Sequence, residues 1–422
     1  MIAAGDVVYR IRCVVGASLI AGALAGCGRI DATLDDRYDS IDRAAGKARN
    51  ESILRNIARA SEDIPLTFMA FSKVSGSLQA NVSAALPNFV IGPSPFPTQV
   101  QRDVVIGNTT LGGSTTAANA VDFAILESSD FYRALLDPSD LLDFNYLIRQ
   151  GYSRELLFWL FADSVRITIK NKRHLEFYEF RNGVDGDESC QYLPGLRQKV
   201  CFRNIVDVAI GAGLSVQSIT REEPNSSGGG GQGRGAKGSS NSSKPTRRTI
   251  SRLCFDPFFL KQAATESPAA HNMFRLFLKA YPIPIDPLCS SDPDPKQFNA
   301  LGTDRLKIGS GKKGGKIEFE IVTRSTFGIY QFLGRILAAD AMDRIMMTGR
   351  NGASEDERRI LSIVRDQAAD CAVNITLRGK YYCVPERGSD NTKRIFSLLS
   401  QLIALKTQTQ DLGITPTVRL SP

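Results

Sequence analysis

The run SRELLFWLFADSVRITIKNKRHLEFYEF, residues 153–180, combines a helix pattern with two strand patterns. Residues 153–164 are mostly apolar, and Ser153 stands where a helix N-cap is expected. The following residues alternate apolar and polar side chains on both sides of Asn171-Lys172. This period of two predicts a pair of half-buried strands joined as a hairpin. A helix that leads into an antiparallel hairpin is typical of the α+β class.

The same two patterns recur on both sides of this run. Apolar residues at helical spacing predict helices at 40–61, 137–151, 203–212, 257–264, 268–280, 325–342 and 391–406. Alternating residues predict strands at 214–220, at 249–255, as a pair within 304–323, and as a hairpin at 371–383. We therefore predict an α+β protein of mixed helices and antiparallel hairpins.

Three details of these predicted helices can be compared directly with a structure. In helix 137–151, either Asp137 or Ser139 is expected to be the N-cap, and Gly151 is expected to end the helix. In helix 325–342, Ser325 is the expected cap. The buried stripe of that helix is expected to contain Phe327, Tyr330, Leu333, Ile336 and Leu337.

The N-terminal segment has the plan of a secretory signal peptide. Arg10 and Arg12 precede an almost uncharged run from Cys13 to Gly26. That run is about 14 residues long, whereas a transmembrane helix needs about 20. It ends within IAGALAGCGR, residues 20–29, and the tetrapeptide Leu24-Ala25-Gly26-Cys27 resembles the lipobox of bacterial lipoproteins.

The lipobox resemblance implies that Cys27 is the first residue of the mature protein. In that family the cysteine thiol carries a diacylglycerol and its amine is acylated, typically with palmitate. Several acyl chains are enough for a stable membrane anchor. Asp directly after the cysteine favours retention in the inner membrane, whereas Gly28 follows here. The resemblance therefore favours the periplasmic side of the outer membrane over the inner membrane, and the alternative is a cysteine in a buried apolar helix.

Two further segments resemble uncharacterised proteobacterial lipoproteins. They are KARNESILRNIARASEDIPLTFMAFSKVSGS, residues 47–77, and RSTFGIYQFLGRIL, residues 324–337. This resemblance implies no activity. Together these features predict a signal peptide at 1–26, a tether at 27–40, an N-terminal α+β region at 41–220, a Gly/Ser-rich loop at 221–248 and a C-terminal α+β region at 249–422.

Six cysteines follow the lipobox cysteine, and an even number in an exported protein favours disulfides. Six cysteines allow fifteen pairings, among which the sequence does not choose strictly. Two pairs each flank a predicted turn, which makes local pairing easy, and two cysteines are left over. We expect the disulfides Cys190–Cys201, Cys371–Cys383 and Cys254–Cys289.

Residues 221–248, REEPNSSGGGGQGRGAKGSSNSSKPTRR, contain no apolar run and cannot bury enough surface to fold. They lie between two predicted strands, which indicates a long disordered insertion within one sheet. Their net charge of +4 can attract anions over the Debye length, about 8 Å at physiological salt. In an envelope such anions belong to lipids, lipopolysaccharide or peptidoglycan; the alternative is a solvated linker without a ligand. The predicted anion-binding residues are Arg221, Arg234, Lys237, Lys244, Arg247 and Arg248.

Catalytic and metal-binding motifs are sparse. The chain has no G-x-S-x-G, H-E-x-x-H or C-x-x-C, and its two histidines are His174 and His271. A zinc site is therefore disfavoured as the role of the cysteines. Each histidine is more often structural than catalytic in such a position. We expect no cofactor, no metal and no catalytic residue.

The whole pattern predicts an outer-membrane lipoprotein with a non-catalytic structural or assembly role in the bacterial envelope. Without residues 1–26 the net charge is about +7. The expected partners are membrane lipid, through the acyl anchor, and an envelope protein or anionic envelope polymer; export disfavours nucleic acid. The alternative is a lipid-anchored periplasmic hydrolase. A cleft that gathers Ser, His and Asp would favour the hydrolase, and an Arg-rich exposed patch would favour the binding role.

Overall fold

The computed structural model shows two compact units. Unit 1 comprises Met1–Leu66 and Arg133–Leu405, and unit 2 comprises Thr67–Tyr132 and Lys406–Pro422. The structure describes residues 39, 42–79, 84–85, 110–111, 116–170, 174–184, 190–223, 246–281, 288–289, 305–308, 316–343, 345–347, 354–366, 370–407 and 417–420. Helices and antiparallel sheets make up both units, which confirms the α+β class.

A four-stranded antiparallel sheet lies at the centre of unit 1, in the order β11-β12-β5-β6. The predicted hairpin of the 153–180 run forms its β5–β6 pair. One face of the sheet is buried by alternate apolar residues, as period-two patterning requires. The strands are β11 (Arg305–Ile308), β12 (Lys316–Thr323), β5 (Ala162–Lys170) and β6 (Leu175–Arg181).

Helices α4 (Arg154–Phe161) and α5 (Phe202–Gly211) pack against this sheet. Ser153 is the N-cap residue of α4, as predicted, although its side chain makes no capping hydrogen bond. Helix α4 ends at Phe161 and β5 begins at the next residue, so the predicted helix is three residues too long. Helices α6 (Pro257–Glu266) and α7 (Pro268–Ala280) follow in the chain, and α7 lies against α5.

Arg324 explains why α4 ends where it does. This arginine is 4% exposed, and its guanidinium donates to the carbonyl oxygen of Trp159 at 3.1 Å and to that of Asn182 at 2.7 Å. Its Nε contacts Asp163 Oδ1 at 3.2 Å, and its charge stands 3.9 Å from the ring centre of Phe332. Burial lowers the pKa of Arg324 to about 10. The arginine thus satisfies carbonyl groups that a longer α4 would have used itself.

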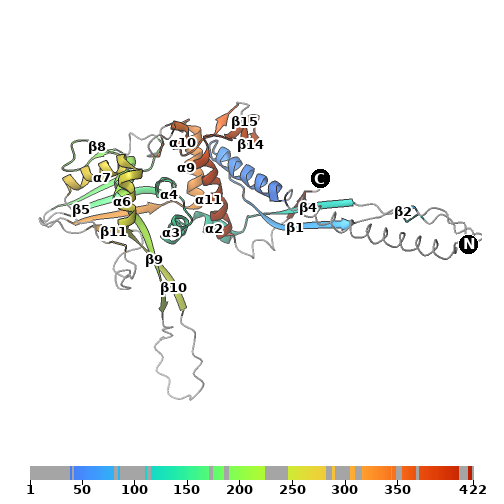
Figure 1. Cartoon of the computed structure of the whole chain (residues 1–422), viewed down its shortest axis with the longest axis horizontal. Helices are drawn as coiled ribbons and strands as arrows, with labels where there is room; N and C mark the ends of the chain where they lie inside the picture. The colour runs from blue at the N-terminus through green and yellow to red at the C-terminus, as the bar shows by residue number, and fades with distance from the viewer. Residues whose placement is uncertain are drawn as a thin grey trace, which may run out of the picture. The chain divides into compact units, whose positions relative to one another are not determined.

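A two-stranded ribbon of β9 (Leu214–Glu223) and β10 (Thr246–Phe255) runs away from the sheet in Figure 1. Its register extends from Leu214 opposite Phe255 to Glu223 opposite Thr246. The two predicted strands do pair, and they are longer than predicted. Residues 221–223 and 246–248 belong to these strands, which corrects the expected ends of the disordered insertion; residues 224–245 lie outside the described residues.

Helix α3 (Leu141–Arg149) packs on the inner part of this ribbon. Its N-cap is Asp140, whose side chain accepts a hydrogen bond from the Leu142 amide, so both expected caps were wrong. Asp140 directly precedes the first buried leucine, and Ser139 is itself buried. Gly151 follows the helix with φ of 89°, as expected for a helix stop.

Helices α9, α10 and α11 and a small sheet come from the C-terminal part of unit 1. Helix α9 (Thr326–Ala338) is capped by Ser325, which accepts a hydrogen bond from the Gly328 amide at 3.0 Å. It ends four residues before the predicted end, and Phe327 is only half-buried. The other elements are the first helix, at residues 42–60, α10 (Glu355–Arg358), α11 (Asp390–Lys406), β13 (Val364–Arg365), β14 (Cys371–Leu377) and β15 (Lys380–Pro385).

The six cysteines form the three predicted disulfides. Two close short loops, with sequence separations of 11 and 12, and the third has a separation of 35. In the chain-entropy picture these lengths correspond to about 3 and about 4 kcal/mol of stabilisation. The pairs are Cys190–Cys201, next to the β7 (Gln191–Tyr192) and β8 (Lys199–Val200) pair, Cys371–Cys383 across the β14–β15 hairpin, and Cys254–Cys289.

Unit 2 is built on a three-stranded antiparallel sheet of order β1-β4-β16. Phe68 and Phe131 pack edge to face, with ring centres 5.7 Å apart. Throughout the described part of the chain, no helix has the length and apolar character needed to cross a bilayer. The elements are β1 (Met69–Gln79), β2 (Ala84–Ala85), β3 (Thr110–Leu111), β4 (Thr116–Ile125) and β16 (Thr417–Leu420), together with α2 (Ser129–Leu136), which continues into unit 1.

Candidate functional site

The predicted anchoring and anion-binding residues are only partly described. Cys27, Arg234, Lys237 and Lys244 lie outside the described residues, so lipidation and the tip of the basic loop stay predictions. The other three basic residues lie on the β9–β10 ribbon, where Arg221 is opposite Arg248 and Glu222 is opposite Arg247.

The structure places the two histidines on different parts of unit 1. His174 is exposed just before β6. His271 lies in the first turn of α7, where its Nδ1 atom is buried without a hydrogen-bond partner among the described residues. Within the same described ranges, no three His, Cys, Asp or Glu side chains come together as metal ligands.

A cavity of about 550 Å³, lined by both charged and apolar residues, opens in the C-terminal half of unit 1. Its lining comes from four places in the chain: the end of α9, the α10 segment, residues 362–365 and the turn before α11. Three aspartates and three arginines stand among the described lining residues, so the charges of these six side chains balance. They are Asp340, Asp343, Asp356, Arg359, Arg365 and Arg387.

Backbone geometry at two positions shapes this cavity. Asp340 follows the end of α9 with φ of 50°, a left-handed conformation that Asp adopts more readily than most residues. Gly388 has φ of 71°, and a side chain there would stand 3.0 Å from Cβ of Asp356. Helix α10 begins with a capping box, in which Ser354 and Glu357 satisfy each other's amides.

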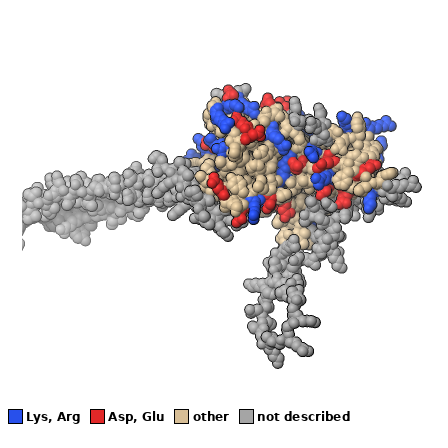
Figure 2. Space-filling view, turned by 180° about the vertical axis from the view of Figure 1, so that it is seen from behind, with Lys and Arg blue, Asp and Glu red and all other residues tan. Residues whose placement is uncertain are grey.

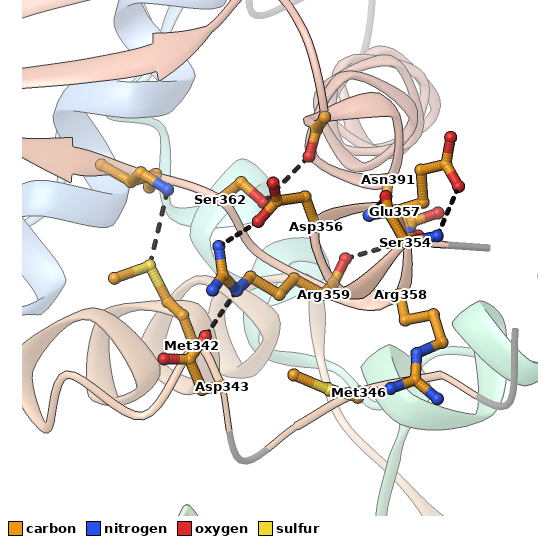
Figure 3. A network of polar contacts seen from close by, with 12 residues as sticks. Met342, Asp343, Met346, Ser354, Asp356, Glu357, Arg358, Arg359, Ser362 and Asn391 are labelled. Carbon is orange, nitrogen blue, oxygen red and sulfur yellow. Dashed lines mark hydrogen bonds and ion pairs between the residues drawn. The ribbon is translucent and has the colours of Figure 1, made fainter.

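Arg359 forms the central ion pairs of the site (Figure 3). Its Nε lies 2.5 Å from Asp343 Oδ1, and its Nη1 lies 2.5 Å from Asp356 Oδ1. Both aspartate side chains are more than half exposed, whereas that of Arg359 is 29% exposed. Two carboxylates therefore share one guanidinium at this side of the cavity.

Hydrogen bonds connect the segment that carries Asp356 and Arg359 to the start of α11 and the turn before it. Asn391, at the start of α11, donates from its amide nitrogen to the carbonyl oxygens of Glu357 at 2.9 Å and Arg359 at 2.8 Å. Ser362 donates from its Oγ to the Gly388 carbonyl at 3.4 Å, and its amide donates to Thr392 Oγ1 at 2.8 Å. Figure 3 shows Asn391 beside Glu357, and its two hydrogen bonds connect the start of α11 to the backbone of the α10 segment.

The remaining lining charges are differently placed. Arg365 donates from Nη2 to the Leu337 carbonyl, while its Nε is buried without a partner among the described residues. Arg387 and Asp340 are exposed, and within the described ranges neither makes an ion pair. Among the described lining residues, two arginines and one aspartate therefore have no ion-pair partner.

The described lining residues of the cavity do not include the set of side chains that a serine hydrolase uses. Ser362 is the serine among them and donates its hydroxyl to a backbone carbonyl, and neither histidine is among them. A nucleophile of this kind needs a general base within hydrogen-bond reach. The arrangement is suited to ionic recognition rather than to acyl transfer.

The wider surface carries charges of both signs. Figure 2 shows basic and acidic side chains interspersed over the described surface on that face, rather than gathered by sign. The net charge of the whole chain is +8, so the surplus is modest for 422 residues. The cavity is therefore distinguished by its arrangement of charges and not by an excess of one sign.

Sequence reasoning missed all six charged residues of this cavity. Two short charged segments, DAMDR at 340–344 and EDERR at 355–359, were the available signal. Residues 340–342 were instead assigned to the end of a helix.

Comparison with known proteins assigns no function to the chain. No protein-family model, no curated protein and no solved structure matches it. The site must therefore be interpreted from its own residues.

Proposed function

We propose that this chain is an outer-membrane lipoprotein that faces the periplasm and has a non-catalytic binding role in the structure or assembly of the bacterial envelope. The compartment is supported by the three disulfides, because such bonds persist in oxidising compartments. The anchor is supported by the lipobox-like tetrapeptide that ends at Cys27.

The observation that carries the binding role is the lining of the 550 Å³ cavity. Among its described lining residues are three arginines and three aspartates, two of the aspartates are already paired with Arg359, and Ser362 donates its hydroxyl to a backbone carbonyl. Such a site recognises charge and offers no activated nucleophile. This lining supports binding over the hydrolase alternative.

Membrane fractionation with mass spectrometry of the mature N-terminus tests the anchor. Wild-type protein should be in the outer-membrane fraction and begin with an acylated Cys27. The Cys27→Ser variant should lose the acyl mass and leave that fraction. Cys13→Ser is the matched control, because Cys13 lies within the predicted signal peptide, and it should behave as wild type. Mature protein that retains residues 1–26 would contradict the proposal.

A further inference from the structure

We propose that the cavity binds a small zwitterionic group, with its anion on Arg365 and Arg387 and its ammonium on Asp340. This inference rests on the binding role proposed above and names the class of ligand. The volume of about 550 Å³ lies within the range of ligand cavities in proteins, roughly 300–1,000 Å³.

The ion pairs already present decide which charges a ligand can use. Arg359 is held by both Asp343 and Asp356 at 2.5 Å, so these three groups satisfy one another. The remaining lining charges are two arginines and Asp340. A ligand with an anionic and a cationic group matches that set, whereas a simple anion would leave Asp340 without a partner.

Arg365 and Arg387 form the predicted anion side. Both arginines line the cavity, and Nε of Arg365 is buried without a hydrogen-bond partner among the described residues. The turn that carries Arg387 leads directly into α11, a helix of 17 residues that begins at Asp390. The positive end of that helix dipole favours negative charge at the same side of the cavity.

Asp340 forms the predicted cation side. It stands two residues beyond the end of α9, a helix of 13 residues that ends at Ala338. The negative end of this helix dipole favours a cation. The cavity therefore lies between the C-terminal end of one helix and the N-terminal end of another, and this polarity matches the placement of the side-chain charges.

An ammonium and an anion a few atoms apart occur in two chemical sources. One is the free termini of a short peptide, and the other is a phosphoethanolamine headgroup. Both present the same pair of charges, so the structure assigns the shared chemistry and the experiment distinguishes the sources.

The test is calorimetric titration of the purified full-length protein in detergent. The zwitterionic probes are alanyl-alanine and O-phosphoethanolamine. The single-charge probes are N-acetyl-alanyl-alanine and ethyl phosphate, which keep only the anion, and alanyl-alanine amide and ethanolamine, which keep only the cation. At least one zwitterion should bind, and its single-charge relatives should bind at least tenfold more weakly.

Two variants and two matched controls locate the binding. Arg387→Gln and Asp340→Asn should each weaken the zwitterion at least tenfold; Asn also tolerates the φ of 50° at position 340. Arg394→Gln, on the exposed side of α11, and Asp63→Asn, at an exposed position with φ of 53°, should stay within twofold of wild type. Melting curves would confirm that all four variants are folded.

Several outcomes would overturn the zwitterion proposal. It fails if neither zwitterion binds, if a single-charge probe binds as tightly, or if the control variants lose as much affinity as the cavity variants. The anchoring proposal is tested separately by fractionation, so a failed titration leaves it intact. A Cys27 that is not acylated would likewise leave the titration result unchanged.

Discussion

At the residue scale, the carboxyl group of Asp207 in α5 is buried, and its burial disfavours the charged form. Asp207 is only 8% exposed. Desolvation raises the pKa of its carboxyl group to about 6, whereas the charge of nearby Arg203 lowers that pKa. A carboxyl whose pKa is higher in the folded state favours folding while it is protonated. This stabilisation is lost as the pH rises from about 4 to about 6.

Replacing Asp207 by Asn should therefore stabilise the protein at neutral pH. A shift of about 2 pKa units corresponds to a gain of at most about 3 kcal/mol at pH 7.5, and to little change at pH 4. Urea unfolding at both pH values measures the difference. Asp63→Asn, at an exposed position, is the control and should change neither value. A loss of stability for Asp207→Asn at pH 7.5 would contradict this prediction. It would show that a partner stabilises the Asp207 carboxylate by more than desolvation destabilises it.

The sequence predicted single residues well only where the cause is local. Ser325 is a cap because it directly precedes an apolar helix, and the cysteine pairs at the two short loops are close in the chain. Asn56 shows the limit of such local patterns, because a polar residue in an amphipathic helix is expected on its solvent face and Asn56 is only 2% exposed. Its burial depends on contacts that helical spacing alone does not reveal.

The charged cavity could not be predicted at this scale either. Its ion pairs join residues 343, 356 and 359, and its other charges come from positions 340, 365 and 387. The charged segments were visible in the sequence. Their meeting depends on α9 ending at Ala338 and on the left-handed conformation at Asp340, neither of which an apolar pattern specifies.

At the element scale, the crossing of the first helix and α9 depends on one glycine. A Cβ atom built on Gly334 would stand 2.5 Å from Cβ of Ala60 and 2.6 Å from its backbone carbonyl carbon. Such distances are far shorter than van der Waals contact, and backbone cannot move aside as the end of a flexible side chain can. The two helices approach closely because position 334 carries no side chain.

Gly334→Ala should destabilise the protein although alanine is the better helix former. Overpacking at such a contact lowers the free energy of unfolding by about 1–3 kcal/mol. The higher helix propensity of Ala raises it by only about 1 kcal/mol. Gly46→Ala is the matched control within the first helix, since nothing lies within 4 Å of its added Cβ. Thermal unfolding should show a lower midpoint for Gly334→Ala and an equal or higher one for Gly46→Ala. Equal midpoints for both variants would mean that the helices can separate without cost.

Most helices and strands were predictable, and their ends were less so. The hairpins within 153–180 and at 371–383 were predictable because their strands are neighbours in the chain and alternate with period two. The boundary between α4 and β5 was missed because Arg324, more than 150 residues away, binds the carbonyls at that end. Distant partners of this kind decide where an element stops.

At the scale of the whole molecule, the β9–β10 ribbon connects the described fold with the basic loop. Glu223 and Thr246 are opposite each other in its register, so a two-residue turn can join them. Replacing residues 224–245 by Asn-Gly should not lower the free energy of unfolding. The shorter connection should raise it by up to about 2 kcal/mol, because each halving of loop length contributes about 0.6 kcal/mol. Urea unfolding measures this, and a clear loss would show that residues 224–245 make stabilising contacts.

The same replacement tests whether the loop recruits anionic envelope polymer. It removes Arg234, Lys237 and Lys244 and leaves the three basic residues of the strands in place. Cosedimentation with lipopolysaccharide vesicles should weaken, and the loss should be largest at low salt, because the Debye length grows from about 10 Å at 0.1 M to about 30 Å at 0.01 M. A full-length variant with these three residues changed to Gln is the control, and it should lose as much binding as the shortened chain if charge alone is responsible. Equal, salt-insensitive binding by all three proteins would contradict this prediction and show that the basic residues of the loop do not bind the polymer. The cavity in unit 1 would then be the remaining candidate for recognition.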